Sequence, residues 1–78
     1  MSRGPVAKRS IIIHGRKTSI SMEAAFWDAA KDIANKDDLP IARLVEQIDE
    51  SRRPHHNLSS AIRMFVLNHY VVMARSVP

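Results

Sequence analysis

The amino-acid sequence predicts a mainly α domain with one short strand, and three observations support this fold class. Apolar and polar residues alternate from Lys17 to Met22, as they do in a half-buried strand. In three later segments, apolar residues recur at intervals of three and four positions, as they do along one face of a helix. The chain has 78 residues and no cysteine, so we expect a single domain without disulfides, in a reducing cytoplasm.

The N-terminal segment is strongly basic. Residues 1–21 contain five of the 12 lysines and arginines and none of the eight acidic residues, which gives this segment a charge of +5 and the rest of the chain −1. Residues 1–8 are predicted to form a flexible basic arm, because Gly4-Pro5 interrupts regular structure. A concentrated positive charge indicates a polyanionic partner, with nucleic acid as the first candidate; a solvated arm without a partner is the alternative.

The alternating stretch places three side chains on each face of the predicted strand. Those expected to point inward are Thr18, Ile20 and Met22, and those expected to point outward are Lys17, Ser19 and Ser21. A lone strand does not stay folded in water, so this strand requires a partner. Just before it, the isoleucines at 11–13 form a run too short for a signal peptide or a membrane span. That run either forms an additional strand or extends the first one beyond a bend at Gly15.

The first predicted helix begins after Ser21 and ends near Lys36. The Ser21 hydroxyl is the expected N-cap, because it can accept a hydrogen bond from a free amide of the first turn. Glu23 in that turn suits the positive end of the helix dipole. Phe26 and Trp27 lie on an alanine-rich helix and are predicted to join the core.

Two further amphipathic helices are predicted. The second spans residues 40–52, with Pro40 at its first position, where a missing N–H costs nothing. The third starts after Asn57, a suitable N-cap, and apolar residues surround it almost completely, which indicates a helix in the centre of a core or between two subunits. The domain is expected to cover residues 9–74, with residues 75–78 as a tail. Its small size, together with the apolar surface that nearly surrounds the third helix, predicts a homodimer.

This order of elements resembles the ribbon-helix-helix family of bacterial DNA-binding proteins, in a subgroup with an additional C-terminal helix. The stretch from Arg16 to Asp49 carries the resemblance to the family. The run from Lys8 to Ser19, together with Phe26-Trp27 and the run from Asn57 to Ala61, carries the resemblance to the subgroup, which covers about residues 8–70. The resemblance implies a βαα fold plus a third helix, with the strands of two chains paired antiparallel in an intertwined homodimer. The resulting two-stranded ribbon would enter the major groove of double-stranded DNA, with higher-order assembly on DNA left open.

The resemblance also implies which residues contact DNA. The outward strand residues that would reach base edges are Lys17, Ser19 and Ser21. The phosphate ligands would be the side chains of Lys8, Arg9 and Arg16 and the free amides at the start of the second helix, on Ile41, Ala42 and Arg43. Pro40 stands where the family often has a capping serine or threonine, so one hydroxyl contact to phosphate is missing.

Catalysis and metal binding are not expected. The four histidines include the adjacent pair His55-His56, whose side chains rarely converge on one ion, and the chain has no cysteine. Neither the adjacent acidic pairs nor Ser59-Ser60 have partners at a spacing typical of an active site. We therefore expect a transcriptional regulator without a cofactor, a membrane segment or enzymatic activity. The alternative is a dimeric protein-interaction module of antitoxin type.

Overall fold

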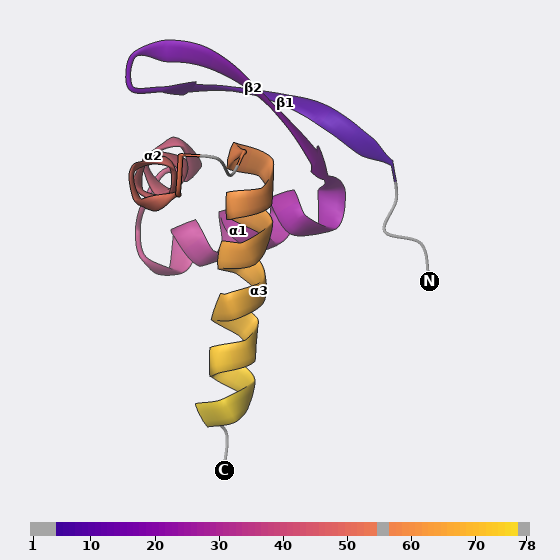
Figure 1. Cartoon of the computed structure of the whole chain (residues 1–78). Helices are drawn as coiled ribbons and strands as arrows, with labels where there is room; N and C mark the ends of the chain where they lie inside the picture. The colour runs from indigo at the N-terminus through magenta and orange to yellow at the C-terminus, as the bar shows by residue number, and fades with distance from the viewer. Residues whose placement is uncertain (1–4, 55–56, 77–78) are drawn as a thin grey trace.

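A two-stranded antiparallel hairpin lies across three helices (Figure 1). The structure is a computed structural model, and it describes residues 5–54 and 57–76. The elements follow one another in the order β1 (Val6–Ile13), β2 (Arg16–Glu23), α1 (Ala24–Lys36), α2 (Ile41–Ser51) and α3 (Leu58–Ser76). β1 begins inside the segment predicted as a flexible arm, and α3 continues beyond the predicted end of the domain.

The prediction of one strand was wrong, because the partner of β2 comes from the same chain. β1 and β2 pair along their whole length, with Ser10 opposite Ser19 and Ile13 opposite Arg16. The strands are joined by His14 and Gly15, whose φ angles are 51° and 75°. Positive φ at both positions is the requirement of a two-residue type I′ turn, which matches the twist of a hairpin. Of the two alternatives for the isoleucine run at 11–13, the additional strand is therefore confirmed.

The helix boundaries lie close to the predicted ones, with differences at the starts of α1 and α2. Glu23, and not Ser21, is the N-cap residue, because strand pairing continues until Glu23 stands opposite Val6. Pro40 is the N-cap of α2 and stands one position before the helix. The predicted cap of α3 is confirmed, since Asn57 Oδ1 accepts a hydrogen bond of 2.8 Å from the amide of Ser60.

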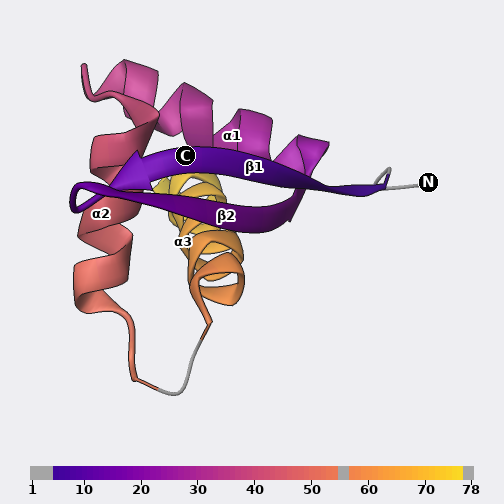
Figure 2. The same cartoon turned by 90° about the horizontal axis from the view of Figure 1, so that it is seen from above.

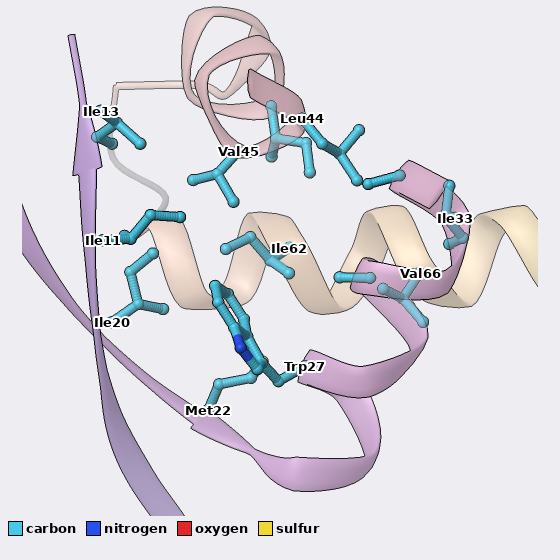
Figure 3. Close-up of a cluster of buried hydrophobic side chains, with 13 residues drawn as sticks. Ile11, Ile13, Ile20, Met22, Trp27, Ile33, Leu44, Val45, Ile62 and Val66 are labelled. Carbon is cyan, nitrogen blue, oxygen red and sulfur yellow. The ribbon is translucent and has the colours of Figure 1, made fainter. Parts of the chain in front are cut away.

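One apolar core joins the inner face of the hairpin to all three helices (Figure 3). Ile20 and Met22, on the predicted inward face of β2, are 2% and 0% exposed. Trp27 contributes from α1, Val45 from α2 and Ile62 from α3, and all three are buried. Burial of this core fixes which face of the hairpin is turned to the solvent, since side chains alternate along a strand.

The second half of α3 extends away from the other described elements (Figure 1). The exposed large apolar side chains of α3 are Met64, Leu67, Tyr70, Val71, Val72 and Met73. We call this set the α3 apolar surface. Its exposure agrees with the prediction that apolar residues surround this helix. Across the described part of the chain, helices with the length and hydropathy needed to cross a bilayer are absent.

Candidate nucleic-acid interface

The face of the hairpin that points away from the helices is open to solvent (Figure 2). Within residues 8–12 and 17–21, six exposed residues occupy it, arranged as three directly opposed pairs: Lys8 with Ser21, Ser10 with Ser19, and Ile12 with Lys17. We call these six residues the outer face of the hairpin. The three residues predicted to contact bases, Lys17, Ser19 and Ser21, all belong to it.

The chemistry of the outer face suits the edges of base pairs. Two lysines supply positive charge and hydrogen-bond donors, and three serines can both donate and accept. None of its six residues is acidic, so no negative charge on this face opposes a phosphate backbone. A two-stranded ribbon also fits the major groove of B-DNA, which is about 12 Å wide.

Arg9, one of the expected phosphate ligands, lies on the inner side of the hairpin. It stands opposite Ile20, is half-buried, and its Nη2 donates to the carbonyl oxygen of Met22 at 3.4 Å. Its Nε is buried, without a hydrogen-bond partner in the described part of the chain. The parity of the strand is the physical reason, because Arg9 follows Lys8 and must point to the opposite face. Of the three expected side-chain ligands, Lys8 alone is on the outer face.

Arg16 is the first residue of β2, next to the turn of the hairpin. It is exposed and contributes to the lining of an open cavity of about 510 Å³ between the hairpin, α2 and the start of α3. Ile13 and Leu58 form apolar parts of this lining, and Asp49 and Arg52 form charged parts. Arg16 is thus placed toward α2, at the rim of the hairpin, and not among the outward pairs.

Two acidic residues of α2 hold the turn of the hairpin. The amide of His14 donates to Glu46 Oε2 at 2.8 Å, and His14 Nε2 lies 3.2 Å from Asp49 Oδ2. The hydrogen bond from the His14 amide, and then that from Arg43, lower the pKa of Glu46. The pKa of Asp49 is lowered chiefly by its hydrogen bond from Arg52, whose Nε is 2.6 Å from Oδ1. These contacts join the turn of the hairpin to α2.

A second polar anchor holds the other end of the hairpin. Arg63 of α3 donates from Nε and Nη2 to Glu23 Oε1, at 2.8 Å in each case. Glu23 ends β2 and is 6% exposed, so this ion pair lies at the edge of the core. It was not predicted, because the two residues are 40 positions apart and no local pattern links them.

The start of α2 offers fewer free amides than expected. The amide of Arg43 donates to the carbonyl oxygen of Pro40 at 3.0 Å, so it is not available to a phosphate. The side chains of Ile41 and Ala42 pack against the core. Figure 2 shows this end of α2 beside the end of α1, to one side of the hairpin.

The histidines do not assemble a metal site in the described ranges. Within 5–54 and 57–76, no group of three or more His, Cys, Asp or Glu side chains could hold an ion. His14 contacts Asp49, and the ring of His69 meets that of Tyr70 edge-on at 5.2 Å. The pair His55-His56 lies outside the described residues.

Comparisons with known proteins agree with this architecture. A family model described as a ribbon-helix-helix domain matches residues 6–70. Among solved structures, an uncharacterized protein from Bordetella pertussis Tohama I is similar over 94% of this chain, with a TM-score of 0.78 and 31% identity. The match spans 62% of the length of that chain. Among curated proteins, none matches this sequence significantly.

Proposed function

Because this chain belongs to the ribbon-helix-helix family, we propose that it is a sequence-specific DNA-binding protein that acts as a transcriptional regulator. The observation that carries the proposal is the outer face of the hairpin, a polar and basic surface on the side opposite the core. In this proposal the hairpin enters the major groove, where Lys17 donates to a guanine and Ser19 and Ser21 contact neighbouring base edges. Lys8, at the far end of the same face, reaches a phosphate.

We further propose that two copies act together. The α3 apolar surface supports this, since its side chains are exposed in the described chain and water contact with so many apolar groups is unfavourable. Each strand of the two-stranded sheet also has one edge without a neighbouring strand in the described residues. The assembly would be a symmetric homodimer, in the cytoplasm, with no catalytic role.

A protein-interaction module of antitoxin type is the second candidate. The same α3 apolar surface favours it, because an exposed apolar helix face is also suited to a different protein. The two candidates differ in what the outer face of the hairpin does. It is required for binding in the first and has no role in the second.

The deciding experiment is a selection of bound sequences from random duplex DNA, followed by affinity measurements on a selected and a scrambled duplex across a salt series. Lys17→Ala should weaken binding to the selected duplex about 10-fold or more and change the scrambled one much less. Lys8→Ala should weaken both alike and reduce the salt slope by roughly 0.9 for each chain that binds. Lys36→Ala, at the end of α1, is the matched control and should leave the preference unchanged.

Two results would contradict the proposal in different ways. Equal weakening of both duplexes by Lys17→Ala would make Lys17 a phosphate ligand only. No effect of Lys17→Ala or Lys8→Ala on DNA binding, or no DNA binding at all, would favour the protein-interaction module.

A further inference from the structure

One residue of the outer face of the hairpin does not share its polar character. Ile12 is 64% exposed, whereas Ile11 and Ile13 beside it are 9% and 5% exposed. The packing of the core explains the two buried isoleucines and leaves the exposed one unexplained. Single exposed apolar residues are common on proteins, but this one stands among two lysines and three serines on the surface proposed to read DNA.

The position of Ile12 is fixed by its partner across the hairpin. It stands directly opposite Lys17, the residue proposed to donate to a guanine. Opposed residues in an antiparallel pair have Cβ atoms about 5 Å apart, and successive base pairs are about 3.4 Å apart along the duplex. Two such side chains on one face therefore reach the same base pair or neighbouring ones.

The major groove offers one apolar group, the 5-methyl of thymine. The other base edges in the groove present hydrogen-bond donors and acceptors, which an isoleucine side chain can only desolvate. Contact with a thymine methyl buries apolar surface on both partners and leaves no polar group unsatisfied.

We propose that Ile12 determines specificity by contacting the 5-methyl of a thymine beside the guanine read by Lys17. This inference rests on the proposed function and adds β1 to the reading surface. Ser10, opposite Ser19 on the same face, lies in reach of the same groove. The selected sites should then contain a guanine and a thymine in neighbouring base pairs.

The test replaces each thymine of the selected duplex by uracil, which lacks the methyl group and keeps the same hydrogen-bonding edge. At one position next to the guanine, uracil should weaken binding of the natural protein roughly 4-fold, the value for burying one methyl-sized group. Ile12→Ala should bind the thymine and uracil duplexes equally, and Ile12→Val, which keeps a branched apolar side chain, should still distinguish them.

Val6→Ala is the matched control. Val6 is also an exposed apolar residue of β1, 54% exposed, but it is six positions from Ile12, or roughly 20 Å along a strand. This variant should retain the full difference between thymine and uracil. Circular dichroism of all three variants establishes that each is folded.

The outcomes separate this inference from the function on which it rests. If the natural protein selects no duplex, the DNA-binding proposal fails and the inference with it. The DNA-binding proposal stands if the natural protein selects particular sites and Lys17→Ala no longer distinguishes them from scrambled DNA. If, at such sites, uracil weakens binding of the natural protein and of Ile12→Ala to the same extent at every position, the thymine contact of Ile12 is refuted.

Discussion

The two faces of the hairpin can be compared by making one substitution on each, Ile20→Ala and Ile12→Ala. The side chains are identical, but Ile20 is 2% exposed and Ile12 is 64% exposed. Truncation of a buried isoleucine to alanine costs about 2–5 kcal/mol, because apolar contacts are lost and a cavity remains. A surface substitution away from such packing changes the free energy of unfolding by less than about 0.5 kcal/mol.

The loss expected for Ile20→Ala is large for a chain of this size. Small domains are stable by roughly 0.05–0.15 kcal/mol per residue, so the total for 78 residues is on the order of 4–12 kcal/mol. Ile20→Ala should therefore remove a major part of the stability, and Ile12→Ala almost none. The measurement is urea unfolding followed by circular dichroism, with all variants at the same protein concentration because subunit association contributes to apparent stability.

A particular result would refute this reasoning. If Ile12→Ala destabilised the protein as much as Ile20→Ala at every protein concentration, the outer face of the hairpin would be part of a core. The assignment of that face to DNA would then be wrong.

Three other changes test the contacts that position the hairpin. Arg63→Leu should lower the free energy of unfolding in urea by about 3 kcal/mol, the lower end of the range for breaking a buried ion pair, because 29% of the Arg63 side chain is exposed. Adding Glu23→Leu should recover part of this loss, and no recovery would contradict a paired role of the two residues. Gly15→Ala should lower the free energy of unfolding by about 1–2 kcal/mol through backbone strain alone, because φ is 75° and an added Cβ meets no atom within 4 Å. An unchanged midpoint of urea unfolding would contradict the geometry of the turn. Glu46 and Asp49 have lowered pKa values, so their contribution to stability is present above the ordinary carboxyl pKa of about 4 and is lost as the pH falls below it. Glu46→Gln should therefore reduce the loss of stability at acid pH, and an unchanged loss would contradict a stabilising role of the Glu46 carboxylate.

The elements that could be predicted from the sequence are those with a regular apolar period. Ile20 and Met22 alternate with polar residues in β2, and the helices carry their apolar residues on one face, so each of these elements and its inner face were recognisable. The side chains of β1 also alternate between the inner and outer faces, but two residues break the alternation of apolar and polar residues in its sequence. Arg9 is a charged residue on the inner face, and Ile12 is an apolar residue on the outer face.

The contacts that position the candidate site could not be predicted, because they join segments far apart in the chain. The amide of His14 donates to Glu46 across 32 positions, and Arg63 reaches Glu23 across 40. A motif describes neighbours in sequence, so it can indicate that a strand is present but not on which helix the strand will rest. The placement of Arg9 was missed for a related reason, since its face depends on the register between β1 and β2.

The connection of β1 to β2 through the two-residue turn at His14 and Gly15 also determines how the candidate DNA surface assembles. Hairpins whose strands are neighbours in the chain form in about 1–10 μs, and the event involves one molecule. The pairing of β1 with β2 within one chain therefore forms at a rate that does not depend on protein concentration. Dilution that separates two subunits would lower the number of hairpins that meet a DNA site together, while β1 and β2 of each chain would remain covalently joined through the turn.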